Sequence, residues 1–420
     1  MTQLEHQLKR AKEASYVLAR LSTAKKNAVL RSLAGALQTH AREILAANAR
    51  DLAKQGEAYP LRDRLLLHED RLKAIIHGVH TVVKLPDPVH EVLEKRTLPN
   101  GLHLSRVRTP LGVIGIIYEA RPNVTVEIVS LTLKTGNATV LKGGEDAHET
   151  NTCLVRLIRK VLLRHGLPKD AVVMIDSFDR TLSDALMQAN RYVDLLIPRG
   201  SDRLIQYVRQ NATVPVIETG AGVCHTYVEK SADVALAVRV VENAKTRRVS
   251  VCNALDTIVV DAAIAKKFLE KLAPRFEAHS VEIFADAPSF SLLSKIYPHQ
   301  LLKKAKDSDF GREFLSMKCS MKVVKNAKEA MAFIQKKTSG HSEAIITRNQ
   351  KRAREFTETI DAAAVYVNTS TAFTDGFEFG LGAEIGISTQ KLHARGPMAL
   401  RELTSSKWVI FGQGQTRSVA

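Results

Sequence analysis

From about residue 110 onward, short apolar runs alternate with longer stretches of helical spacing, and this alternation restricts the fold strongly. Short apolar runs bounded by turn residues indicate buried strands, and strands that alternate with helices form parallel sheets covered on both faces. Because the pattern occurs in two successive sets, we expect an α/β protein of two lobes with a cleft between them. The expected strands are 112–118, 138–141, 171–175, 193–197 and 214–217 in the first set, and 257–260, 281–284, 322–324, 344–347 and 364–367 in the second.

Two segments differ from this α/β body. Residues 4–80 have the apolar spacing of helices throughout. In 91–108, two alternating runs flank Asn100-Gly101, which is a strong signal for a hairpin turn. A hairpin that projects from an α/β body needs a covering partner, so we expect an oligomerisation arm in a homo-oligomer.

Composition excludes several classes of protein. The chain has no run long enough to span a membrane, and its four cysteines are far apart with no CxxC pair, which argues against a disulfide framework and a zinc site. We therefore expect a cytoplasmic protein without a metal. The net charge of +17 is spread along the chain and aromatic residues make up only 5%, so we expect no nucleic-acid or membrane partner. Such a field favours anionic small molecules.

Cys252 is a candidate nucleophile on a short loop between a predicted helix and a predicted strand. Lys245, Arg247 and Arg248 precede it, and nearby cations favour the reactive thiolate. A free cysteine is, however, more often a small buried hydrophobe. Local sequence leaves both interpretations open.

Two further turns carry polar groups. At 195–201 a buried strand ends in Pro-Arg-Gly-Ser and runs into a helix, whose amides attract phosphate, while Gly200 permits close approach and Ser201 can cap the helix. An ordinary strand-to-helix turn explains the pattern equally well, and Lys142 ends another strand at the same edge. Asn123, after a turn at Pro122, is either an N-cap or an amide aimed at an oxyanion. Three histidines share no metal-ligand spacing, so we expect them to be structural or ordinary hydrogen-bonding groups and not ligands: His225, His341 and His393.

Taken together, several segments resemble the gamma-glutamyl phosphate reductase family of the aldehyde dehydrogenase superfamily over nearly the whole chain. These segments are 110–125, 196–200, 222–225, 243–246, 250–254, 379–384 and 387–397. The resemblance implies an aldehyde-dehydrogenase-like α/β fold with two Rossmann-like lobes and a small β oligomerisation element. The implied division is an NADPH-binding domain at 1–90 and 109–225, an arm and tail at 91–108 and 405–420, and a catalytic domain at 226–404.

The same resemblance implies a reaction, the NADPH-dependent reduction of L-glutamyl 5-phosphate to L-glutamate 5-semialdehyde and phosphate. This is the second step of proline biosynthesis from glutamate, and it implies a functional link to glutamate 5-kinase. By family position, Cys252 would form a thioester and Asn123 would donate to the oxyanion. The residues implied to contact the cofactor are Lys142, Pro198, Arg199, Gly200, Ser201 and Glu313.

The substrate contacts are expected at Arg121, Arg247 and Glu218. Glu218 lies near the position of a water-activating glutamate in oxidising relatives, but water would hydrolyse the thioester, so we expect a structural or substrate-amine contact instead. Ala372 stands where the family has an arginine, a natural clamp for carboxylate or phosphate. Arg247, where the family usually has glutamine, would restore that charge if it points into the cleft.

Two other functions predict different behaviour. An NAD(P)-dependent aldehyde dehydrogenase acting on a related semialdehyde would oxidise it to the free acid without phosphate. A basic nucleic-acid-binding protein would bind DNA or RNA with steep salt dependence, and Cys252→Ala would leave its function unchanged.

Overall fold

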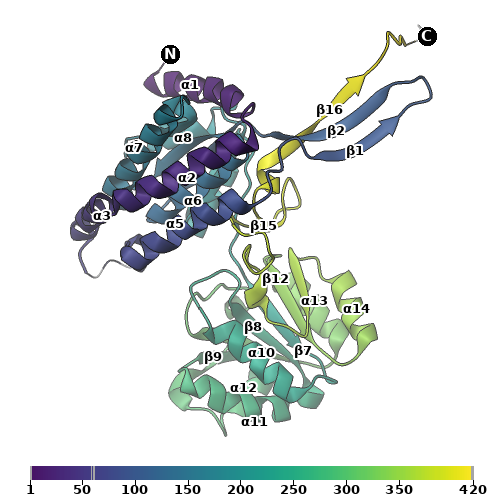
Figure 1. The fold of residues 1–420 in the computed structure, drawn as a ribbon. Helices are drawn as coiled ribbons and strands as arrows, with labels where there is room; N and C mark the ends of the chain where they lie inside the picture. Colours follow the sequence, from purple (N-terminus) through teal and green to yellow (C-terminus); the bar gives the residue numbers. More distant parts are fainter. Residues whose placement is uncertain (1, 58, 60–61, 418–420) are drawn as a thin grey trace.

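The computed structural model describes residues 2–57, 59 and 62–417 as two α/β lobes and a projecting arm (Figure 1). The first lobe contains a four-stranded parallel sheet in the order β5-β4-β3-β6. Its strands are β3 (Val113–Tyr118), β4 (Ala138–Gly143), β5 (Val172–Met174) and β6 (Leu195–Arg199). Its later helices are α6 (Pro122–Lys134), α7 (His148–Arg164), α8 (Arg180–Met187) and α9 (Asp202–Asn211). Every residue of β3 is buried, as expected for a strand covered on both faces.

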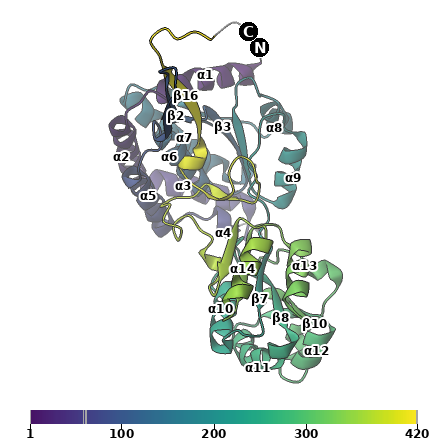
Figure 2. The ribbon, with the colours of Figure 1, turned by 90° about the vertical axis from the view of Figure 1, so that its right-hand side faces the viewer.

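The N-terminal helices belong to the first lobe. They are α1 (Gln3–Leu18), α2 (Thr23–Thr39), α3 (Ala41–Gln55), α4 (Arg62–Leu65) and α5 (Glu69–Lys84). Helices α2 and α3 pack on α7, and α5 packs on α2 and α6. The short helix α4 lies at the junction of the lobes, where Figure 2 shows it. No helix within the described ranges is long and apolar enough to cross a membrane.

The prediction of a strand at 214–217 is wrong. Of these four residues, Val216 alone forms a bridge, with Leu196. The Leu196 amide donates to the Pro215 carbonyl, and the Ile217 amide donates to the Leu196 carbonyl. Pro215 has no N–H to donate, so the ladder cannot continue.

The second lobe contains a seven-stranded sheet of parallel pairs, in the order β10-β9-β11-β8-β7-β12-β13. Its strands are β7 (Cys224–Val228), β8 (Leu255–Asp261), β9 (Glu282–Ala285), β10 (Leu302–Lys304), β11 (Lys318–Val324), β12 (Ser342–Ile346) and β13 (Ala364–Val367). Its helices are α10 (Val234–Thr246), α11 (Ala262–Ala278), α12 (Ala287–Leu293), α13 (Ala327–Lys337) and α14 (Gln350–Thr359). Strand β7 was not expected, because the buried polar residues His225 and Thr226 interrupt its apolar run. This strand begins two residues before the expected domain boundary at 226.

The arm is a three-stranded antiparallel sheet in the order β1-β2-β16. Strands β1 (Val92–Thr97) and β2 (His103–Pro110) form the expected hairpin, with Gly101 in its turn at a φ of 84°. Strand β16 (Thr404–Phe411) comes from the other end of the chain and pairs with β2. The last residues of the expected tail, 418–420, lie outside the described residues.

After β13 the chain returns to the first lobe (Figure 2). Residues 383–403, with the short strands β14 (Gly386–Ser388) and β15 (Gly396–Met398), bury Ile385, Met398 and Leu403 in the hydrophobic core of that lobe. This differs from the expected catalytic domain at 226–404, because the apolar residues of the segment pack on the first sheet. The junction is therefore bordered by the first lobe, by the second lobe and by the returning segment 383–403.

Candidate active site

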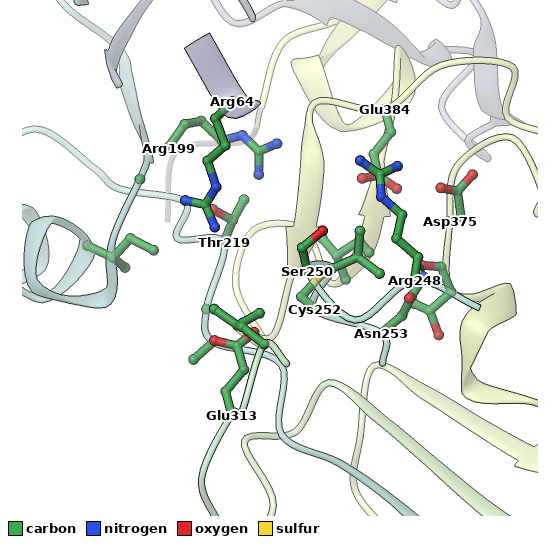
Figure 3. Close-up of a pocket in the computed structure, with 18 of the residues that line it drawn as sticks. Arg64, Arg199, Thr219, Arg248, Ser250, Cys252, Asn253, Glu313, Asp375 and Glu384 are labelled. Atoms are coloured by element: carbon green, nitrogen blue, oxygen red, sulfur yellow. Dashed lines mark hydrogen bonds between the residues drawn. The ribbon is translucent and has the colours of Figure 1, made fainter. Parts of the chain in front are cut away.

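A strongly charged cavity lies at this junction. Figure 3 shows Cys252 between Arg64 and Arg199 on one side and Arg248, Asp375 and Glu384 on the other. The lining side chains that carry charge are Arg64, Arg121, Arg199, Arg247, Arg248, Glu313, Asp375 and Glu384. In the first lobe they come from the carboxyl edge of the parallel sheet and from α4, the usual place for a ligand in such a sheet.

Cys252 brings the expected thiol into this cavity, and burial has the largest effect on the pKa of that thiol. Burial raises the pKa of the Cys252 thiol to about 12, Glu384 raises this pKa further, and Arg199 opposes the shift. The expectation that upstream cations favour the thiolate does not hold for Lys245, which is fully buried and donates to the Leu255 carbonyl at 2.8 Å. At rest the sulfur is a thiol, so its activation needs a proton acceptor.

The loop of Cys252 is tied to the segments around it. Asn253 donates its side-chain amide to the carbonyls of Ala372 and Thr374, at 3.2 and 3.0 Å. On the other side Gly222 packs so closely that a Cβ there would lie 1.8 Å from the Cys252 carbonyl oxygen. Ala372 is buried behind the loop and does not line the cavity. The alanine therefore leaves no gap in the cavity wall where the family has an arginine.

His341 is the residue that sequence reasoning missed. We expected a structural histidine, yet its Nε2 lies 3.1 Å from the Cys252 Sγ. Cys252 precedes β8, Cys224 begins β7, and His341 precedes β12. Because these parallel strands are neighbours, their amino ends meet at one edge of the sheet. The strand order would have revealed the pair, but β7 was not recognised. Within the described residues, no group of His, Cys, Asp or Glu side chains is arranged to hold a metal ion.

The resting contacts of Asn123 do not include the Cys252 loop. Asn123 lies inside α6, so it is not the N-cap, and its amide donates to Glu127 at 3.0 Å. It is not among the residues that line the cavity. Arg121, two residues earlier, does line it, and burial lowers the pKa of that guanidinium to about 10.

The Pro-Arg-Gly-Ser turn reaches the cavity through Arg199 and Gly200. Ser201 caps α9 by accepting from the Leu204 amide, which confirms the predicted cap. An anion already occupies the helix terminus, since the Glu119 carboxylate accepts from the Ser201 amide at 2.8 Å and from its hydroxyl at 3.1 Å. A Cβ on Gly200 would lie 2.6 Å from this carboxylate. The carboxylate oxygens stand in for those of a phosphate, so the turn fits an anionic cofactor.

The other expected contacts divide into two groups. Glu313 and Arg247 line the cavity, and Glu313 accepts from the Gly222 amide at 3.1 Å. Lys142 and Glu218 do not line it. Burial lowers the pKa of Lys142, and its Nζ lies 3.4 Å from the Gly143 carbonyl. The Glu218 carboxylate lies 3.8 Å from Arg209 of α9.

Comparisons with known proteins agree with this architecture. The model of the "Aldehyde dehydrogenase family" matches residues 1–288. The gamma-glutamyl phosphate reductase of Chlorobium limicola is 51% identical over 416 residues, which cover 99% of each chain. That of Heliobacterium modesticaldum is 48% identical over 412 residues, with 97% of each chain covered. The crystal structure of the Thermotoga maritima gamma-glutamyl phosphate reductase is 44% identical, covers 99% of this chain and 100% of its own, and superimposes with a TM-score of 0.96.

Proposed function

Since the chain belongs to the gamma-glutamyl phosphate reductase family, within the aldehyde dehydrogenases, we propose that it reduces L-glutamyl 5-phosphate to L-glutamate 5-semialdehyde with NADPH. Membership of this family makes the chain an oxidoreductase of the aldehyde group. The observation that carries the proposal is the position of Cys252 in a cavity lined by five arginines from both lobes. An acyl phosphate with a second carboxylate is a substrate that such a cavity attracts.

The cofactor is assigned to the first-lobe side of the cavity. Ser201 and Gly200 at the start of α9 would hold the phosphates in place of the Glu119 carboxylate. Lys142 ends β4 at the same sheet edge and would add a cation, and Glu313 would hold the nicotinamide ribose. When bound, the reduced nicotinamide supplies the hydride that reduces the acyl group.

Cys252 performs the first chemical step. Its sulfur attacks the acyl carbon, a thioester forms, and phosphate leaves into the field of the arginines. We assign the developing oxyanion to the Cys252 amide and to Asn123, whose side chain must release Glu127 to reach it. Glu218 pairs with Arg209 and does not line the cavity, so we assign it no role in activating water. This arrangement favours reduction over hydrolysis.

The substrate carries both negative and positive groups, so its site needs charges of both signs. Its carboxylate and phosphate are matched by Arg121, Arg247 and Arg248, and its ammonium by the carboxylates of Glu384 and Asp375. Arg247 thus takes over the role of the family arginine that Ala372 replaces. The cavity therefore selects a substrate with an α-amino acid head group and a phosphorylated tail.

The test is the reverse reaction, the NADP-dependent oxidation of glutamate semialdehyde with and without phosphate. The proposal expects turnover that requires phosphate and disappears in Cys252→Ala. Turnover without phosphate would instead identify an aldehyde dehydrogenase that releases the free acid. Asn123→Ala should lower kcat about 100- to 1,000-fold, the usual effect of removing an oxyanion donor.

We propose further that the arm mediates a homo-oligomer. Trp408, Ile410 and Phe411 of β16 are exposed large apolar residues on this projecting sheet, and exposed apolar clusters mark interaction sites. The four cysteines are free thiols, which supports a reducing, cytoplasmic location. The functional link to glutamate 5-kinase stays a prediction, which rests on the need for a kinase to supply the acyl phosphate.

A further inference from the structure

His341 forms the closest polar contact of the Cys252 sulfur that the structure shows, at 3.1 Å from Nε2. The imidazole has no exposed surface, and the thiol faces the cavity. A buried histidine beside a surface-accessible thiol is the geometry of a nucleophile and its base. In the mechanism proposed above, Cys252 has no other assigned proton acceptor.

A chain of hydroxyl groups contacts the other imidazole nitrogen of His341, Nδ1. His341 Nδ1 lies 2.8 Å from the Ser342 hydroxyl. That hydroxyl lies 2.6 Å from the Thr374 hydroxyl, which in turn lies 2.8 Å from the Tyr366 hydroxyl. Thr374 can accept from both neighbours, because a hydroxyl oxygen has two lone pairs. We assign the Ser342 proton to Thr374, which leaves the Ser342 oxygen free to accept the ring proton of Nδ1.

Cys224 does not compete for this nitrogen. Its Sγ lies 3.8 Å from His341 Nδ1, but it donates to the Cys252 carbonyl at 3.2 Å. With the ring proton on Nδ1, the Nε2 lone pair points at the Cys252 thiol. Each nitrogen of His341 therefore has one role, and the resting pair is neutral.

We propose that His341 is the general base that accepts the Cys252 proton during attack and returns it to the sulfur when the product leaves. The proposal rests on the function assigned above. As the S–H proton moves to Nε2, the sulfur bonds to the acyl carbon and the C–O bond breaks. Phosphate leaves with that electron pair and takes a proton from water. When the hydride has reduced the acyl group, the C–S bond breaks and the sulfur recovers the proton from Nε2.

Burial explains why the transfer waits for substrate. It raises the pKa of Cys252 to about 12 and lowers that of His341 to about 4, so no stable ion pair forms at rest. Around the sulfur, Glu384 and Glu313 also disfavour the thiolate, and Arg199 favours it. The proton moves only as the sulfur bonds to carbon, and a resting thiol is oxidised more slowly than a thiolate.

The test compares wild type with His341→Gln, because glutamine can still hydrogen-bond the sulfur but cannot accept its proton. We expect phosphate-dependent turnover at pH 7 to fall about 100- to 10,000-fold and to recover as the pH rises. Alkylation of Cys252 by iodoacetamide, followed by mass spectrometry, should be slower in His341→Gln than in wild type at pH 7. Its rate should rise only at a higher pH than in wild type. NADPH binding and the thermal midpoint should be unchanged. His279→Gln, an exposed histidine of the same lobe, is the matched control.

Ser342→Ala provides a second variant, which removes the partner of Nδ1 and leaves the Nε2 contact in place. It should slow alkylation about three- to tenfold without a change in NADPH affinity. Identical alkylation profiles for wild type, His341→Gln and Ser342→Ala would overturn the proposal, even if turnover requires phosphate. Alkylation needs no substrate, so a His341-dependent profile in a chain without reductase activity would refute the proposed function and leave the base in place.

Discussion

Gly222→Ala tests whether the position of the Cys252 loop determines the rate. A Cβ at residue 222 would lie 1.8 Å from the Cys252 carbonyl oxygen, whereas real Cβ contacts under 3.0 Å are essentially unknown. The obstacle is backbone, so the loop must move by about 1 Å, and a displacement of that size costs roughly 100-fold in rate. This corresponds to about 2.7 kcal/mol of activation free energy. Phosphate-dependent turnover should therefore fall about 100-fold, with a folded protein and little change in NADPH affinity.

Gly220→Ala is the matched control, because it adds the same methyl group two residues earlier. There the Cβ would meet the end of the Thr389 side chain, at 2.8 Å from its hydroxyl oxygen, and that side chain can rotate. We expect less than about a threefold loss, consistent with a rotamer adjustment. Equal losses in the two variants, or full activity of Gly222→Ala, would refute the argument from loop position.

Three further predictions concern the charges around the cavity. Burial raises the pKa of Glu384 to about 7, so its carboxylate loses its negative charge as the pH falls through 7. The KM of the wild type for the substrate should therefore rise below pH 7. Glu384→Gln should already have a high KM at pH 8, and this KM should not rise further below pH 7. Glu119→Gln removes a negative charge from the terminus of α9 and should lower the Kd for NADPH about three- to tenfold in a fluorescence titration; a weaker complex would show that the carboxylate helps to bind the cofactor. Arg247→Gln should raise the substrate KM about tenfold and leave the KM for NADPH unchanged; an unchanged substrate KM would show that Ala372 has no substitute.

Local patterns in the sequence were sufficient for most strands of the two sheets and for the hairpin of the arm. The apolar runs of β3 and β8 and the Asn100-Gly101 turn each carry their own signal, because burial and turn geometry act over a few residues. The return of residues 383–403 to the first lobe was not predictable in this way, since their apolar residues do not reveal which sheet they cover. The same limit hid His341. A single histidine has no periodicity, and its role depends on the order of strands that are distant in sequence.

The site combines a positive cavity with a thiol that its surroundings keep protonated, and the two properties serve one purpose. An anionic acyl phosphate is drawn in by the arginines, while the Cys252 sulfur stays protonated until an electrophile reaches it. Lowering the thiol pKa with more cations would make the sulfur reactive at all times and would also expose the resting enzyme to oxidation. A neutral base at 3.1 Å avoids this, because His341 removes the proton only as the new bond forms. Burial makes the thiol harder to deprotonate. Transfer of the proton to His341 offsets this in the transition state, so it raises the rate and leaves the resting enzyme unchanged.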